Sequence, residues 1–279
     1  MRKILESLMI VPNIHLLRVE APDVAGQIEP GQFVILRVEE EGERIPLSVS
    51  DWDTDQGTIT MVFMNVGGTT NRLASLKAGE HLPTVVGPLG NPTEIERYGT
   101  VLCLGGCYGI GSILPIARAL REKKNRVITV IEARSQFLLY WEDRLKAVSD
   151  ELVAITRDGT RGRKGHVTRL PEIVQAHGPV DRMIVNGCTY LLRRASETSR
   201  PLKMKTIVSL NPIMIDGTGM CGVCRVSVGG TTRFACVDGP DFDGHEVDWD
   251  ELAQRRRMYL REEAVTVQHE RCRSQTGLR

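Results

Sequence analysis

The stretch that decides the fold lies at residues 101–120 and reads VLCLGGCYGIGSILPIARAL. It begins with a continuous apolar run, which is typical of a buried parallel strand, and it ends in an apolar pattern with helical spacing. Between the two stand four glycines, Gly105, Gly106, Gly109 and Gly111. A glycine-rich turn from a strand into a helix lets backbone N–H groups approach a pyrophosphate. The same turn also occurs without a ligand, so its surroundings decide between the two interpretations.

Downstream of this turn, strand-like and helix-like segments alternate. RVITVIEARS at 126–135 and DRMIVNGCT at 181–189 have the character of strands, while YWEDRLKAV at 140–148 and PEIVQAHG at 171–178 have that of helices. Such alternation predicts a doubly wound, Rossmann-like parallel α/β sheet. We therefore expect an NAD(P)-binding domain over residues 99–210.

Upstream of the turn, the chain is rich in short β-type segments such as QFVILRVE and GTITMVFMNVG, with Gly and Pro between them. Evenly spaced short strands predict a small antiparallel β-barrel, which we place at residues 1–98. The fold class expected for the whole chain is therefore multi-domain, with a β part and an α/β part.

The composition excludes several classes of function. Of the 279 residues, 36 are Lys or Arg and 35 are Asp or Glu, and no basic stripe is present, so nucleic acid is not an expected partner. No segment has the roughly 20 apolar residues that a membrane span requires. The seven cysteines follow no secretion signal, which favours reduced thiols or metal ligands in a cytoplasmic protein.

An acidic residue follows the glycine turn at the distance expected for ribose recognition. Glu132 ends the second predicted strand, where a carboxylate accepts hydrogen bonds from the ribose hydroxyls of NAD(H) and disfavours a 2′-phosphate. Arg134 stands two residues later and favours NADP(H) instead. The sequence leaves the choice between the two nucleotides open.

Two segments of the predicted barrel have the residue types that hold a flavin. In RIPLSVSD at 44–51, Arg44 can reach a diphosphate, Pro46 follows it, and Ser48 can bond the edge of an isoalloxazine ring. The second segment precedes a short helix and forms a second helix-start anion site, made of Gly67, Gly68, Thr69 and Thr70. Each segment alone also fits a surface charge or an ordinary helix cap, and only their order favours a flavin.

The region 211–248 is rich in Gly, Cys and Asp and contains three cysteines with the spacing C-x2-C-x11-C. Plant-type 2Fe-2S clusters are held by C-x4-C-x2-C and a fourth cysteine, and here an aspartate stands at the first position. The candidate ligands are Asp216, Cys221, Cys224 and Cys236. A structural zinc site and an aspartate that only shapes a turn are the alternatives. After this module we expect a charged C-terminal helix and tail over 249–279.

The order of these motifs, R-x-P-L-S, G-G-T-T, G-P-L-G and the glycine-rich turn, resembles the ferredoxin–NADP reductase superfamily. The cysteine module narrows the resemblance to the branch with the electron-transfer subunit of dihydroorotate dehydrogenase. Within that branch, SLNPIMIDGTGMCGVCRVSVGG and FACVDGPDFDGHEVDWDEL closely resemble the small (alpha) subunits of NADH-dependent reduced ferredoxin:NADP+ oxidoreductase, also described as sulfide dehydrogenase subunits. In that family the aspartate replaces the first cysteine and ligates iron.

The resemblance implies roles for particular residues. FAD would contact Arg44, Pro46, Leu47 and Ser48, with its pyrophosphate held at 67–69, and the four glycines of the turn would line the nucleotide site. The chain departs from the family pattern at Cys107, where a third glycine is usual, and at Cys188, in NGCTYLL, where a C-G-P turn is usual.

The function expected from the resemblance is electron transfer between a nicotinamide nucleotide, FAD and a 2Fe-2S cluster. The partner would be a larger flavoprotein subunit with another FAD and 4Fe-4S clusters, in a heterodimer that bifurcates electrons between NADH, NADPH and ferredoxin. An electron-input subunit of another oxidoreductase, of the sulfide dehydrogenase, hydrogenase or dihydroorotate dehydrogenase type, is an alternative. A non-catalytic zinc module that senses a nucleotide is another.

Overall fold

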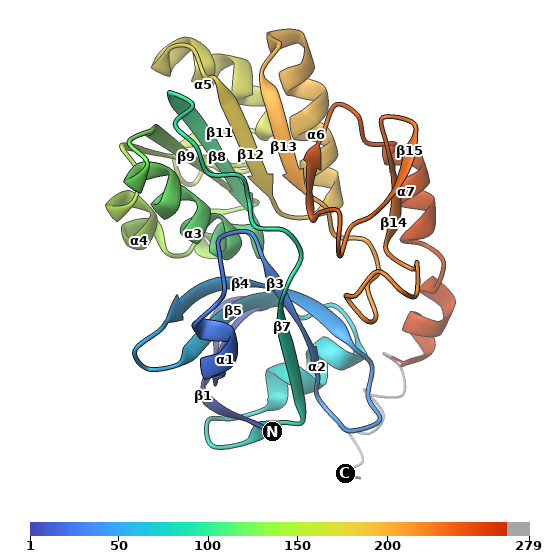
Figure 1. Ribbon diagram of the computed structural model, residues 1–279. Coiled ribbons are helices and arrows are strands. Elements are labelled where there is room, and N and C mark those ends of the chain that lie inside the picture. Colours follow the sequence, from blue (N-terminus) through green and yellow to red (C-terminus); the bar gives the residue numbers. More distant parts are fainter. Residues whose placement is uncertain (267–279) are drawn as a thin grey trace.

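The computed structural model describes residues 1–266. Two seven-stranded sheets dominate it, one antiparallel and one almost wholly parallel, and a two-stranded hairpin lies beside them. Figure 1 shows the antiparallel sheet in the lower half, the parallel sheet with its helices in the upper half, and the hairpin with the last helix along one side. This arrangement confirms the predicted fold class.

The N-terminal sheet curls into a barrel whose strands run in the order β6-β1-β2-β5-β4-β3-β7, with antiparallel neighbours throughout. Its interior is filled by alternate strand residues such as Leu17, Ile59 and Met61, all fully buried. Two short helices complete this part. The elements are β1 (Arg2–Val11), β2 (Ile14–Glu20), α1 (Pro22–Ala25), β3 (Phe33–Arg37), β4 (Ile45–Asp53), β5 (Thr58–Met64), α2 (Gly68–Ser75), β6 (His81–Leu82) and β7 (Thr84–Leu89).

The second sheet has the strand order β11-β10-β9-β8-β12-β13-β16, and only β16 runs antiparallel to its neighbour. The order reverses at β8, because the chain moves to one side for β9 and β10 and to the other for β12 and β13. The strands are β8 (Thr100–Gly106), β9 (Arg126–Ala133), β10 (Glu151–Thr156), β11 (Arg163–Lys164), β12 (Arg182–Asn186) and β13 (Lys205–Ser209). The helices are α3 (Gly109–Glu122), α4 (Glu142–Ala147), α5 (Leu170–His177) and α6 (Thr189–Ser199), with short 3-10 turns at Gln136–Leu138, Val167–Arg169 and Arg200–Leu202.

Helix α3 joins the two large parts of the molecule. Ten of its fourteen residues are buried, because it packs on the parallel sheet and its first turn also meets the barrel. A Cβ added at Gly111 would lie 2.9 Å from Val62 Cβ and 3.0 Å from Ser50 Oγ, so the helix can approach the barrel only with glycine there. Further along, Arg118 donates to Asp51 on β4 at 2.8 Å.

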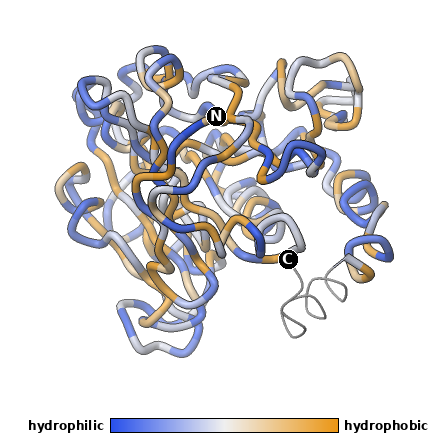
Figure 2. The backbone as a smooth tube through the Cα atoms, turned by 90° about the horizontal axis from the view of Figure 1, so that it is seen from below, coloured by the Kyte–Doolittle hydropathy of each residue, from blue (hydrophilic) through white to orange (hydrophobic). Residues whose placement is uncertain are grey.

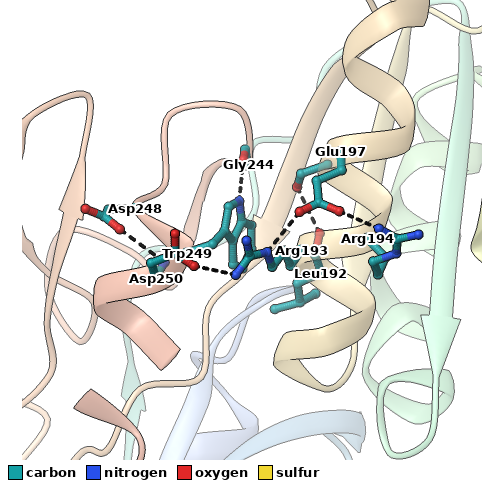
Figure 3. A network of polar contacts seen from close by, with 9 residues as sticks. Leu192, Arg193, Arg194, Glu197, Gly244, Asp248, Trp249 and Asp250 are labelled. Atoms are coloured by element: carbon teal, nitrogen blue, oxygen red, sulfur yellow. Dashed lines mark hydrogen bonds and ion pairs between the residues drawn. The ribbon is translucent and has the colours of Figure 1, made fainter. Parts of the chain in front are cut away.

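The cysteine-containing region packs against both large parts. It contains the hairpin β14 (Arg225–Val228) and β15 (Thr231–Phe234), then β16 (Asp241–Asp243), which returns to pair with β13. Helix α7 (Trp249–Arg255) follows. The side chain of Asp248 caps it, the indole of Trp249 donates to Gly244 O at 3.0 Å, and Arg193 on α6 bonds Asp250 at 2.7 Å (Figure 3).

The C-terminal helix differs from the expectation of one continuous helix. Helix α7 ends at Arg255, a turn occupies 256–259, and a further helical stretch runs from 260 to 266. The rest of the predicted tail, 267–279, lies outside the described residues. The predicted domain boundaries at 98, 210 and 248 stay predictions.

Hydrophobic and hydrophilic stretches alternate along the backbone (Figure 2). Strands β8 and β12 of the parallel sheet are buried almost throughout, as expected for a sheet covered on both faces. Within the described residues, no helix is both long and apolar enough to cross a membrane.

Candidate functional site

The glycine turn lies where the strand order of the parallel sheet reverses. Strands β8 and β12 are neighbours, with Asn186 paired to Gly105 at their carboxyl ends. In open α/β sheets the crevice outside the carboxyl ends of the strands, at such a reversal, is the usual ligand site. The turn after β8 and the turn after β12 both lie at this edge of the sheet.

The glycines of the turn are required by its packing. A Cβ at Gly109 would lie 2.0 Å from the carbonyl oxygen of Asn186, and one at Gly106 would lie 2.5 Å from a methyl group of Leu191. The backbone of the turn therefore lies directly against the turn after β12. Because a bulkier residue would push them apart, the glycines set how closely the two turns pack.

Residues that the sequence did not single out hold the turn in place. Buried Tyr140 accepts from Gly111 N–H at 3.0 Å and donates to Cys107 O at 2.9 Å. Tyr108 donates to the carbonyl of Gly187 at 2.9 Å, and Asn211 donates to the same carbonyl at 3.0 Å. No local pattern points to these contacts, since the partners lie 24 to 79 residues apart.

Glu132 is turned into the protein rather than toward the crevice. One carboxylate oxygen accepts from Val167 N–H at 2.7 Å, and the other lies 2.9 Å from His166 Nε2. Burial raises the pKa of Glu132 to about 7 and lowers that of His166 to about 4. The predicted contact of Glu132 with ribose stays a prediction, as does any contact of the exposed Arg134.

The two flavin segments of the barrel lie together. Arg44 is exposed just before β4, and Pro46, Leu47 and Ser48 are half-buried on that strand. The neighbouring Glu43 accepts a hydrogen bond from the hydroxyl of Thr69.

Helix α2 starts in open space. Its N-cap Gly67 has no atom within 4 Å of where a Cβ would be, and its N–H is capped by the hydroxyl of Thr70 at 2.9 Å. The N–H groups of Gly68 and Thr69 follow in the first turn of the helix, which leaves room for an anion at its positive end.

The cysteine loop presents two pairs of candidate ligands. Cys224 and Cys236 are both buried, with their sulfur atoms 3.2 Å apart as free thiols. Asp216 accepts from the backbone N–H of Thr218 at 2.8 Å and from that of exposed Cys221 at 3.1 Å. These backbone hydrogen bonds, from Thr218 above all, hold the pKa of Asp216 below its ordinary value.

The candidate ligands of this loop have the chemistry of an iron–sulfur site. Within the part of the chain that the structure describes, no three His, Cys, Asp or Glu side chains are gathered as one metal site. Three thiols and a carboxylate in two separate pairs suit a centre of two irons, since iron accepts both thiolate and carboxylate ligands. Glycines at 217, 219 and 222 with positive φ allow the loop to wrap closely around such a centre.

The loop that contains Asp216 and Cys221 also touches the barrel. A Cβ at Gly217 would lie 2.7 Å from a methyl group of Leu89 and 2.9 Å from one of Ile35, on β7 and β3. Asp216 therefore lies beside the barrel wall. At the other end of the module, buried Thr93 donates to half-buried Asp241 at 2.7 Å.

Comparison with known proteins identifies the family. The iron–sulfur cluster binding domain of dihydroorotate dehydrogenase B matches residues 211–248. A Thermotoga maritima protein named as a homolog of the dihydroorotate dehydrogenase B (NAD(+)) electron transfer subunit is 43% identical, over 96% of this chain and 95% of that protein. The chain belongs to this family of electron transfer subunits. A Bacillus mycoides member is 32% identical over 85% of this chain and 94% of its own length.

Solved structures agree with this family of electron transfer subunits. A chain from a structure of NADH-dependent reduced ferredoxin-NADP oxidoreductase, described for its flavin-based electron bifurcation, superposes with a TM-score of 0.92 at 41% identity, over 96% of this chain and 97% of that one. A ferredoxin NADP+ reductase from Neisseria gonorrhoeae shares the fold, with a TM-score of 0.61 at 18% identity over 73% and 90% of the two chains.

Family membership confirms the predicted class of function. The chain is an electron transfer oxidoreductase subunit of the ferredoxin–NADP reductase type, and FAD, a 2Fe-2S cluster and a nicotinamide nucleotide are the cofactors of that class. An electron transfer subunit implies a larger catalytic partner in a heterodimer. The zinc alternative is not supported by these relatives.

Proposed function

We propose that this electron transfer subunit passes electrons between a nicotinamide nucleotide at the glycine turn, FAD on the barrel and a 2Fe-2S cluster in the 211–248 module. The observation that supports this order is the contact of the barrel with both other parts. Helix α3 meets β4 and β5 at Gly111, and the ligand loop meets β3 and β7 at Gly217. A flavin on the barrel therefore has the nucleotide site on one side and the cluster on the other.

In this proposal the barrel binds FAD through Arg44, Pro46, Leu47 and Ser48 and through the first turn of α2. Arg44 neutralises the pyrophosphate, and the N–H groups of the helix start donate to it. Glu43 would have to leave the Thr69 hydroxyl, because two anions cannot share that position. When bound, FAD exchanges hydride with a nicotinamide and single electrons with an iron–sulfur centre.

The proposed cluster ligands divide into the two pairs that the structure brings together. Cys224 and Cys236 would hold one iron, and Asp216 with Cys221 would hold the other. The first pair is buried against the protein core, while in the second Cys221 is exposed and Asp216 is half-buried. With a carboxylate on one iron alone, the two irons would be chemically unequal, and the ligand identity would alter the potential of the cluster.

For the complex, we propose a cytoplasmic heterodimer with a larger subunit that carries FAD and 4Fe-4S clusters and bifurcates electrons between NADH, NADPH and ferredoxin. The support is the similarity to the chain from the bifurcating oxidoreductase over nearly the full length. A dihydroorotate dehydrogenase partner is the second candidate, favoured by the names of the relatives. Asp216 favours the bifurcating partner instead, since the resemblance to the small subunits of that oxidoreductase includes an aspartate at the first ligand position.

The test is an analysis of anaerobically purified protein for flavin, iron and acid-labile sulfide, followed by mixing with NADH or NADPH. We expect one FAD, about two irons and about two sulfides per chain, with bleaching of the flavin band and then of the cluster band. A colourless protein that contains one zinc would overturn the proposal. Co-purification from the native host with a dihydroorotate dehydrogenase subunit would replace the bifurcating partner.

A further inference from the structure

The two departures from the family pattern, Cys107 and Cys188, lie opposite each other in the candidate nucleotide site. Strands β8 and β12 pair in register from Arg182↔Val101 to Asn186↔Gly105. Continuing the same register by two residues places Cys188 opposite Cys107. Neighbouring strands lie about 4.8 Å apart, and disulfides form between Cα atoms about 4.4–6.8 Å apart.

The backbones of the two turns stay close beyond the ends of the strands. Tyr108 bonds the carbonyl of Gly187, and a Cβ at Gly187 would lie 2.9 Å from Gly106 O. Cys107 has a φ of 54°, a conformation that a cysteine rarely adopts. The two side chains are hydrogen-bond partners, and both are free thiols, with Cys107 exposed.

The surroundings of Cys188 favour its thiolate. The hydrogen bond from Cys107 lowers the pKa of Cys188 to about 6, helped by the backbone N–H groups of Leu191 and Tyr190 in the first turn of α6 and by the charge of Arg256. The same hydrogen bond raises the pKa of Cys107. The directions of these shifts favour Cys188 as the thiolate and Cys107 as its hydrogen-bond donor. Buried Cys103 is inert by comparison, because burial raises its pKa to about 12.

We propose that Cys107 and Cys188 form a reversible disulfide that closes the nicotinamide side of the crevice when the thiol–disulfide balance of the cell becomes oxidising. The oxidant is a low-molecular-weight disulfide. The Cys188 thiolate attacks one of its sulfurs, which forms a mixed disulfide and releases one thiolate. Cys107 then attacks the Cys188 sulfur, gives up its proton, and releases the second thiol. Two electrons pass from the cysteine pair to the small disulfide.

The consequence for activity rests on the proposed function, because it requires the nicotinamide to lie between the turns at 105–109 and 187–189. In this proposal a covalent link would hold the two turns together and prevent the nicotinamide ring from entering between them. FAD on the barrel and the cluster loop are untouched by it. The expected effect is loss of flavin reduction by NADH or NADPH, restored by dithiothreitol, without loss of either cofactor.

The experiment treats the purified holoprotein anaerobically with oxidised glutathione and maps its peptides by mass spectrometry without reduction. We expect a cross-linked pair of peptides containing Cys107 and Cys188, lighter by two hydrogen atoms. In Cys107→Ser we expect a stable glutathione adduct on Cys188, because no second thiol is present to displace it. Cys103→Ser is the matched control and should cross-link like the native chain.

The outcomes separate this inference from the proposed function. If no cross-link forms while other exposed thiols react, the disulfide does not exist. If it forms and nucleotide-dependent flavin reduction continues at the native rate, the pair does not control the crevice. If the reduced protein, with flavin bound, is not reduced by either nucleotide, the proposed function fails whatever the thiols do.

Discussion

Asp216 combines a structural and a proposed metal-binding task in one side chain. Its carboxylate organises the loop by accepting from the N–H groups of Thr218 and Cys221, and it stands at the first ligand position of the 2Fe-2S pattern. The sequence predicted the ligand position from spacing. It left the turn role as an alternative, which the hydrogen bonds support, while the ligand role stays a prediction.

Substitutions at Asp216 separate the two tasks. Asp216→Asn keeps an acceptor for the loop N–H groups but loses the charge, so we expect an intact fold with a lower iron content. Asp216→Cys restores a fourth thiolate, so two irons per chain should remain with a shifted visible spectrum. Iron analysis and Mössbauer spectroscopy check both, and the cysteine variant should alter only one of the two iron sites. Native iron content and spectrum in Asp216→Asn would exclude the carboxylate as a ligand.

Glu132 makes stability depend on pH. Its pKa is about 7 in the folded protein, above the ordinary 4.5, so the folded state holds its proton more tightly. Stability is therefore lost as pH rises from about 4.5 through 7, by up to about 3 kcal/mol. His166 acts in the opposite sense, because its lowered pKa costs stability as pH falls from 6.5 toward 4.

Glu132→Gln isolates the carboxyl group, since His166 is retained in both proteins. The amide oxygen can still accept from Val167 N–H. As pH rises from 5 to 7, we expect the melting temperature of the variant to rise relative to that of the native protein. Above pH 7 the difference between the two melting temperatures should stay constant. Parallel melting curves across this range would show that Glu132 does not titrate there.

Among the elements, the turn between β8 and α3 was the most predictable, because glycine spacing and an apolar strand are local signals. The bonds that fix it were not predictable. Tyr140 reaches it from beyond β9, and Asn211 donates to the Tyr108 hydroxyl from the start of the 211–248 module. A pattern within one segment contains no information about partners that only the finished fold brings together. The proximity of Cys107 and Cys188 was not predicted, for the same reason. The sequence shows both cysteines, but not the strand register that places them opposite each other.

Adding one methyl group at Gly109 tests how tightly the turn between β8 and α3 packs. In Gly109→Ala the new Cβ would lie 2.0 Å from Asn186 O, so the start of α3 must move. We expect a loss of about 1–3 kcal/mol in unfolding free energy and weaker nicotinamide nucleotide binding, with FAD retained. Denaturant unfolding and nucleotide titration measure these effects. For unfolding, Gly67→Ala is the matched control, since its φ of −153° and open surroundings accept a methyl group.

At the scale of the whole molecule, the sequence predicted three kinds of part and their order along the chain. It could not predict how they touch. The contact of the ligand loop with the barrel depends on Gly217, whose φ of 76° and missing side chain let it lie against Leu89 and Ile35.

Gly217→Ala should move the ligand loop away from the barrel. We expect NADH to reduce the flavin at the native rate while reduction of the cluster slows, which stopped-flow absorbance at the two bands resolves. Gly230→Ala is a close control, because it has a similar φ of 72° in the same module but nothing within 4 Å of the added Cβ. Equal slowing in both variants would mean that general strain, and not the barrel contact, sets the rate.

The pairing of β16 with β13 has a consequence for how the protein matures in the cell. The last strand of the parallel sheet comes from the 211–248 region that matches the iron–sulfur cluster binding domain, and its residue Asp241 also accepts a hydrogen bond from Thr93. A chain starved of iron and sulfide would have both a disordered ligand loop and an unfinished sheet edge, which is a surface prone to aggregation and proteolysis. We therefore expect the supply of iron and sulfide to limit the amount of folded protein in the cell.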